Sequence, residues 1–108
     1  MKNCESCQLW LSCKDADEAV KISGALLSKK LIACAKQIPV NSTFRWQGKI
    51  ESSNEVLLTM ESRMDLFDEV EKEITKLHSY DTFVLEATLV NRVSKKAQKW
   101  LNQELRNE

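Results

Sequence analysis

Residues 32–62, IACAKQIPVNSTFRWQGKIESSNEVLLTMES, decide the fold. The dipeptide Gln47-Gly48 supplies a tight turn, and the chain on both sides of it is extended. The two arms make a hairpin of about 30 residues, whereas an ordinary strand has roughly 5–6. Pro39 interrupts the first arm, and because proline cannot donate to a ladder we expect a bulge or an unpaired edge there. Long strands leave edges that proteins cover or pair with another chain, so we expect the hairpin to be an oligomerisation element.

The segments on either side of the hairpin continue an alternation of strands and helices. The apolar run Gln8–Cys13 predicts a buried strand, and Asp15, Asp17 and Glu18 are expected to cap the helix that follows it. Apolar residues at helical spacing predict this helix and two more, and they are Ala19, Ile22, Leu26 and Leu27; Phe67, Val70, Ile74 and Leu77; and Val93, Ala97, Leu101 and Leu105. A fourth strand is expected at Thr82–Val90. This order is the split βαβ or ferredoxin-like arrangement, an α+β sandwich with a C-terminal helix.

The composition is that of one neutral globular domain. The chain has 108 residues, with 16 Lys and Arg against 16 Asp and Glu, so we expect a single domain over 1–108 with residues 1–7 as a flexible tail. A neutral balance argues against a nucleic-acid partner, and no apolar run approaches the ~18 residues of a membrane span. Two glycines are too few for a glycine-rich phosphate loop. Without an apolar leader, we expect a cytoplasmic location and reduced cysteines.

Four strings occur in order along the chain, and together they resemble one family. They are LIACAKQIP at 31–39, FRWQGKIE at 44–51, LHSYD at 77–81 and the pair Trp100-Leu101. From Leu9 to Leu105 the chain is similar to the CutA family of divalent-cation tolerance proteins. The resemblance implies a ferredoxin-like homotrimer whose long hairpins pair between subunits, similar in architecture to the PII signalling proteins. It also implies a link to tolerance of copper and other divalent metals.

Cys13 and His78 are the main candidates for a metal site. By the resemblance, each aligns with a residue of the copper site proposed for the family. A thiolate and an imidazole suit Cu(I), Cu(II) or Zn(II), so the hypothesis is that the two side chains approach in a cleft, within one chain or across a subunit boundary. The alternative is a buried thiol and an unrelated histidine at a helix end. One histidine excludes sites that need several imidazoles from one chain, but a trimer carries three.

Other residues are lower-ranked candidates. Cys34 is either a further metal ligand or a small residue packed in the sheet. Tyr80 and Asp81 lie in the expected loop before the fourth strand and are candidates for lining a cleft. Cys4 and Cys7 form a C-x-x-C motif in the expected tail, and one such pair is weak evidence for a metal or redox site because zinc normally takes four ligands.

Four positions depart from the family pattern. Ser79 and Phe83 stand where the resemblance implies prolines, Val84 where it implies a carboxylate, and Glu61 where it implies a lysine. If that lysine and carboxylate are neighbours in the family, their joint loss is a coupled change, because removing one alone would leave a partly buried charge unpaired. The chemistry around His78 can therefore differ from that of the family.

These observations support three hypotheses about function. The first is a non-enzymatic, homotrimeric metal-response protein with no obligatory cofactor, which binds copper or a related metal ion through Cys13 and His78. The second is a PII-like sensor of a small ligand, or a trimeric scaffold for a partner protein. The third is a thiol enzyme with Cys13 as nucleophile and His78 as base, and it is the least supported because the sequence identifies no orienting residue or oxyanion donors.

Overall fold

Strands and helices alternate in the order that the sequence predicts. The structure is a computed structural model that describes residues 5–107. Its elements are β1 (Ser6–Cys13), α1 (Ala16–Ser28), β2 (Cys34–Trp46), β3 (Lys49–Arg63), the short 3-10 helix η1 (Met64–Leu66), α2 (Phe67–Leu77), β4 (Leu85–Leu89) and α3 (Lys95–Glu104). No helix within residues 5–107 is long and apolar enough to cross a membrane.

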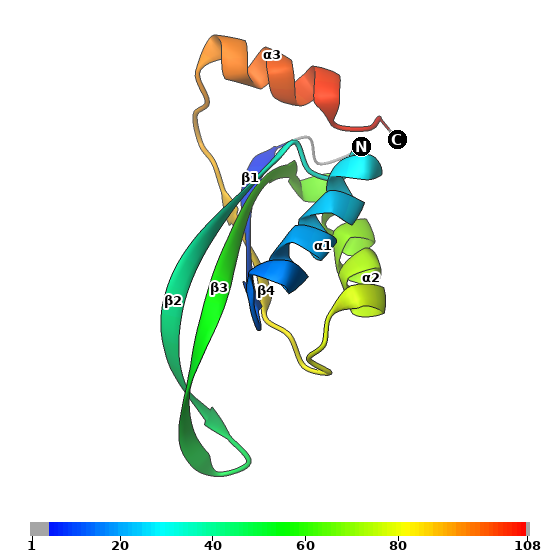
Figure 1. Cartoon of the computed structure of the whole chain (residues 1–108). Helices are drawn as coiled ribbons and strands as arrows, with labels where there is room; N and C mark the ends of the chain where they lie inside the picture. Colours follow the sequence, from blue (N-terminus) through cyan, green and yellow to red (C-terminus); the bar gives the residue numbers. More distant parts are fainter. Residues whose placement is uncertain (1–4, 108) are drawn as a thin grey trace.

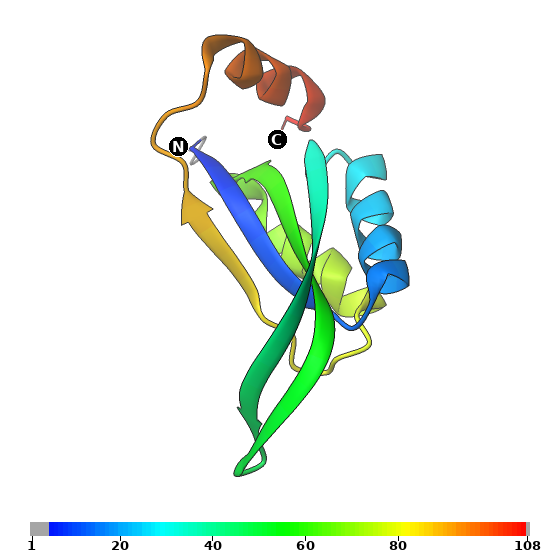
Figure 2. The same cartoon turned by 60° about the vertical axis from the view of Figure 1, so that its left-hand side comes forward.

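One antiparallel sheet of four strands, in the order β2-β3-β1-β4, carries the fold. Helices α1 and α2 lie side by side on one face of it, α3 lies beyond one end, and the β2–β3 hairpin extends from the other end (Figure 1, Figure 2). Every second side chain of β1 points into the layer between sheet and helices. Fully buried members of this core include Leu9, Leu11, Cys13, Ile22, Leu26, Leu58, Met60, Val70 and Ile74. The predicted ferredoxin-like sandwich is confirmed.

The amino-terminal boundary differs from the prediction. Ser6 and Cys7 were expected in a tail, but they are the first residues of β1. Cys7 is 2% exposed within the core, because it continues the inward alternation of the strand. The predicted tail is therefore wrong for residues 6 and 7. Residues 1–4 lie outside the described part of the chain.

The fourth strand is shorter than expected. It begins at Leu85 rather than Thr82. Residues 82–84 instead belong to the α2–β4 loop, residues 78–84, in which Phe83 packs against the core. The β-favouring Phe83 therefore serves packing rather than sheet pairing.

The hairpin outruns the rest of the sheet. β2 pairs with β3 along its whole length, whereas β1 pairs with β3 only as far as Val56, opposite Cys13. Beyond that pair β2 and β3 continue as a two-stranded ribbon (Figure 1). Gln47 and Gly48 have φ values of 50° and 79°, as a two-residue hairpin turn requires. Pro39 lies on the edge strand β2 in unbroken register, so the unpaired edge predicted there is confirmed and the alternative of a bulge is wrong.

Polar contacts fix the ends of α1 and α2. Asp15 is the N-cap of α1 and accepts from the backbone N–H of Glu18 at 2.9 Å. Glu73 of α2 accepts from the ammonium groups of Lys29, the C-cap of α1, at 2.6 Å, and of Lys76, at 2.9 Å. These hydrogen bonds hold the pKa of Glu73 at about 2. The Asp15 cap thus defines where α1 begins, and the ion pair with Lys29 joins the other end of α1 to α2.

Candidate functional site

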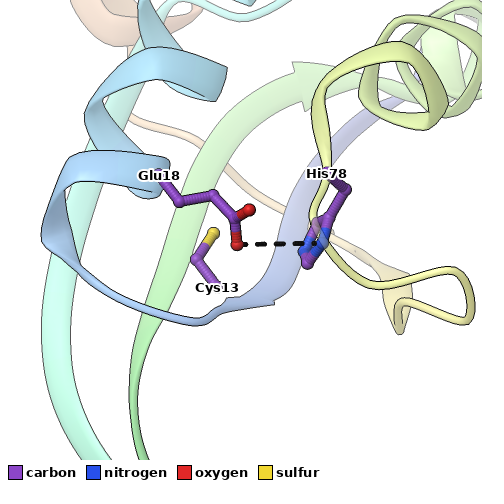
Figure 3. A group of neighbouring side chains, drawn as sticks. All are labelled: Cys13, Glu18 and His78. Carbon is purple, nitrogen blue, oxygen red and sulfur yellow. Dashed lines mark ion pairs between the residues drawn. The ribbon is translucent and has the colours of Figure 1, made fainter.

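Three side chains that can bind metal ions meet at the carboxyl end of β1. Cys13 is the last residue of β1, Glu18 lies in the first turn of α1, and His78 directly follows α2. Their ligand atoms all lie within 4.8 Å of one another (Figure 3). Cys13 and the side chain of His78 are 0% exposed, and the side chain of Glu18 is 5% exposed. Cys13 and His78 are thus neighbours within one chain, and they are buried rather than lining the expected cleft.

Local backbone geometry brings these side chains together. The alternation of β1 points the thiol of Cys13 into the core. α1 begins three residues later, and its third residue, Glu18, faces back toward the strand end. At the end of α2, the backbone N–H of His78 still bonds the carbonyl of Ile74 at 2.9 Å, while its own backbone is extended and leads the chain away from the helix.

The imidazole of His78 has a partner on each ring nitrogen. Its Nε2 lies 2.8 Å from the carbonyl oxygen of Ser12, and its Nδ1 lies 3.0 Å from the backbone nitrogen of Tyr80. A carbonyl only accepts and a backbone N–H only donates, so the network assigns the proton to Nε2 and the lone pair to Nδ1. The ring of Phe83 stacks on the imidazole with centroids 5.2 Å apart. His78 is therefore held as a neutral, oriented ring.

The carboxylate of Glu18 joins α1 to the α2–β4 loop. Its Oε1 accepts from the backbone N–H of Lys14 at 2.9 Å, and its Oε2 accepts from that of Ser79 at 2.8 Å. Oε1 also lies 3.8 Å from Nδ1 of His78. Burial opposes ionisation, but the hydrogen bonds from Lys14 and Ser79 outweigh it and lower the pKa of Glu18.

The sequence predicts Glu18 as a helix cap, which is only part of its role. The spacing from Asp15 to Glu18 is that of a capping box, in which the third residue of a helix reaches back to the chain before it. This spacing is the available sequence signal that the carboxylate turns toward the end of β1. Its contact with Ser79, 61 residues away, has no counterpart in the local pattern.

The thiol of Cys13 is not activated. Burial, followed by the negative charges of Glu18, Glu55 and Asp15, raises the pKa of Cys13 to about 12. Reactive cysteines have lowered pKa values and partial exposure, because the thiolate is the nucleophile. The surroundings of Cys13 therefore count against the hypothesis of a thiol enzyme.

The remaining candidates lie outside this cluster of Cys13, Glu18 and His78. Cys34 is half-buried at the start of β2, where the ammonium of Lys36 lies 3.9 Å from its sulfur. Asp81 is exposed in the α2–β4 loop. Cys7 is buried with a pKa raised to about 11 by burial and by the charge of Asp65, and Cys4 lies outside the described residues. Nothing in the described structure connects these residues with the cluster.

Tyr80 links the loop to the hairpin. Its hydroxyl donates to Oε2 of Glu55 at 2.5 Å, and burial together with this carboxylate raises the pKa of the phenol. Glu55 is the first residue of β3 beyond the end of β1, since Cys13 pairs with Val56. Tyr80 thus bonds the imidazole of His78 through its backbone N–H and contacts the base of the hairpin through its side chain.

Two of the four departures from the family pattern have a visible consequence. Ser79 supplies the backbone N–H that Glu18 accepts, and a proline at this position has no N–H to supply. Phe83 supplies the ring that covers His78. Val84 is 58% exposed, and Glu61 accepts from the backbone of Ala33 through its own carbonyl. The substitutions nearest to His78 therefore fix the imidazole and its neighbouring carboxylate.

The fold and the cluster define a class of protein. It is a ferredoxin-like α+β protein with an overlong hairpin and a buried thiol, carboxylate and imidazole at one strand end. The family model described as "CutA1 divalent ion tolerance protein" matches residues 7–104. The chain belongs to this family.

Individual relatives agree with this assignment. The divalent-cation tolerance protein CutA of Archaeoglobus fulgidus is 34% identical over 95 residues, which cover 88% of this chain and 93% of that relative. The protein of the same name from Pyrococcus horikoshii is 36% identical over 90 residues, covering 83% and 88%. The solved structure of the Archaeoglobus protein superposes with a TM-score of 0.90 at 32% identity and covers 92% of this chain and 97% of that one.

The relatives correct the predicted location. The Archaeoglobus structure is described as a periplasmic protein, and the Arabidopsis thaliana relative, 26% identical over 107 residues, is named chloroplastic. The cytoplasmic prediction is therefore overturned. The prediction rested on the lack of an apolar leader, and relatives of this family are described from other compartments.

The bond from Ser79 to Glu18 can be tested by two substitutions. Ser79→Pro removes the N–H that Oε2 of Glu18 accepts, whereas Ser79→Ala keeps it. A buried carboxylate that loses a donor is destabilised, so we expect Ser79→Pro to lower the free energy of unfolding by about 1 to 3 kcal/mol and Ser79→Ala to lower it by less. Urea unfolding followed by circular dichroism measures both. Equal stability of Ser79→Pro and wild type would show that the bond does not hold the loop.

Proposed function

We propose that this protein is a homotrimeric, non-enzymatic member of the divalent ion tolerance family that binds copper or a related metal ion through Cys13 and His78. The observation that carries the proposal is the burial of these two side chains side by side at the end of β1, from elements that the sequence separates by 65 positions. The names of the matched family and of its relatives refer to divalent-cation tolerance, which agrees with a metal ligand.

The donor chemistry fits such an ion. Thiolate and imidazole are the soft and borderline donors that copper and zinc prefer. The raised pKa of the Cys13 thiol means that an incoming ion must displace a proton from the sulfur. The fixed imidazole of His78 offers Nδ1 on the side that faces Glu18. These residues supply binding, and the region has no activated nucleophile, which favours binding over catalysis.

Exposed apolar residues on the β2–β3 hairpin and the uncovered face of the sheet support a trimer. α1 and α2 cover one face only (Figure 2). Ile38 on β2 lies opposite Leu57, and Leu57 and Trp10 line a shallow hollow of about 380 Å³ on the other face. Toward the tip of the hairpin Phe44, Trp46 and Ile50 are 40%, 47% and 70% exposed. Surfaces of this kind favour association with further chains. None of the comparisons favours the alternative of a PII-like ligand sensor.

The metal proposal predicts which substitutions abolish binding. In a Cys4→Ser background, which removes a thiol outside the described residues, reduced copper is titrated against a colorimetric chelator without oxygen. We expect one equivalent per chain in the wild type, loss of that equivalent in Cys13→Ser and in His78→Ala, and retention in Cys34→Ser. Thermal unfolding of each variant checks the fold. Unchanged stoichiometry and affinity in Cys13→Ser and His78→Ala would overturn the proposal.

The assembly has its own test. Sedimentation equilibrium is expected to give the mass of three chains for the wild type. Ile38→Glu places a charge on the uncovered face and is expected to yield monomers, whereas Val20→Glu on the exposed side of α1 leaves the trimer intact. The pair is matched because Ile38 and Val20 are 45% and 58% exposed. A monomeric wild type, or a trimeric Ile38→Glu, would contradict the assembly through this face.

A further inference from the structure

We propose that Glu18 is the third ligand of this site, and that it extends the site from copper to borderline divalent cations such as Zn²⁺ and Co²⁺. This inference rests on the proposed function, because it needs Cys13 and His78 to bind metal. Within residues 5–107, Cys13, Glu18 and His78 form the one group of three or more potential ligands whose atoms lie this close together.

The carboxylate of Glu18 is positioned to accept a cation without losing its present partners. Each carboxylate oxygen has two lone pairs. Oε1 uses one for the backbone N–H of Lys14 and also faces Nδ1 of His78, 3.8 Å away (Figure 3). Oε2 is held by the N–H of Ser79. Two backbone donors thus fix the orientation of the carboxylate, and one lone pair of Oε1 remains for a cation on the side of the imidazole.

The imidazole of His78 has the surroundings of a ligand that binds through Nδ1. Histidines that bind metal ions commonly donate the other ring N–H to a backbone carbonyl or a carboxylate, which fixes their tautomer. Nε2 of His78 makes this bond to the carbonyl of Ser12 at 2.8 Å. Nδ1 has a single lone pair, which accepts the N–H of Tyr80 at 3.0 Å. A cation at Nδ1 therefore replaces the Tyr80 N–H, while the bond to Ser12 persists.

The set of one sulfur, one nitrogen and one oxygen distinguishes between ions. Zn²⁺ binds Cys, His and carboxylate ligands in tetrahedral sites, and Co²⁺ commonly takes the same donors. Cu(I) is soft and gains little from a carboxylate, so Cys13 and His78 suffice for it. Bond lengths of roughly 2.0 to 2.3 Å place tetrahedral ligand atoms roughly 3.5 Å apart, so the cluster needs to contract by only about an ångström. The thiolate and the carboxylate together balance a charge of two.

The test compares three ions and two acidic residues. In the Cys4→Ser background, Co²⁺ is added anaerobically and its visible absorption is recorded, then Zn²⁺ is added to displace it, and Cu(I) affinity is measured separately. Glu18→Gln removes the charged ligand, and Asp17→Asn is the matched control because Asp17 is its exposed neighbour in the same turn. We expect Glu18→Gln to weaken Co²⁺ and Zn²⁺ at least about tenfold and Cu(I) less than about threefold. Asp17→Asn is expected to leave the affinities for all three ions unchanged.

The outcomes separate this inference from the proposed function. Unchanged Co²⁺ affinity in Glu18→Gln, with loss of binding in Cys13→Ser, overturns the role of Glu18 and leaves the copper proposal standing. A wild type that binds Cu(I) but neither Co²⁺ nor Zn²⁺ does the same. A wild type that binds none of the three ions overturns both.

Two further measurements guard against a folding artefact. If Glu18→Gln unfolds, Glu18→Asp keeps the charge but shortens the side chain, and it is expected to weaken Co²⁺ at least about tenfold as well. Amide hydrogen exchange reports on the imidazole: Zn²⁺ is expected to abolish the protection of the Tyr80 amide in the wild type. Protection that persists in the zinc-loaded protein would exclude Nδ1 as the ligand atom and overturn the inference.

Discussion

The carboxylate of Glu18 is buried at the end of β1, and the arrangement of the site depends on how its charge is satisfied. A buried carboxylate is stable only with donors aimed at it. One donor comes from Lys14, before α1, and the other from Ser79, after α2. The carboxylate therefore holds the α2–β4 loop against the junction of β1 and α1. This places His78 between the carbonyl of Ser12 and the backbone of Tyr80.

The same loop connects the cluster to the hairpin. Tyr80 donates its backbone N–H to the imidazole and its hydroxyl to Glu55, where β3 passes the end of β1. The two-stranded ribbon begins at Glu55. Tyr80 therefore contacts both the cluster and the base of the hairpin, on which the trimer contacts are proposed. A cation that displaces the Tyr80 N–H would act on a residue that also touches the base of the hairpin. The cluster and the base of the hairpin are thus adjacent in space, whereas the tip of the hairpin extends away from the rest of the sheet (Figure 1).

The sequence predicts what depends on local pattern and on recognisable strings. Alternation and helical spacing locate the strands and helices because each element's periodicity reflects burial along a single face. The resemblance to the family singles out Cys13 and His78, although only His78 lies within one of the four strings. The sequence predicts Glu18 only as a helix cap, because its second partner is the backbone N–H of a residue 61 positions away. Any residue except proline provides such an N–H, so the sequence carries no signal of this contact. The sequence predicts too long a strand β4 for a related reason: the β-favouring Phe83 covers the imidazole of His78 instead of pairing in the sheet. Location is not encoded in the folded domain, and relatives with the same fold are described from other compartments.

The tautomer of His78 tests the central claim, which is that hydrogen bonds at the end of β1 hold a neutral imidazole with its Nδ1 lone pair toward the loop backbone. The chain has one histidine, so nitrogen-15 labelling of its ring gives one pair of ring signals. Two-bond proton–nitrogen correlation spectra of the metal-free protein at neutral pH distinguish the protonated from the unprotonated ring nitrogen. The account predicts a protonated Nε2 and an unprotonated Nδ1. A proton on Nδ1, in either the other neutral tautomer or an imidazolium, would contradict it.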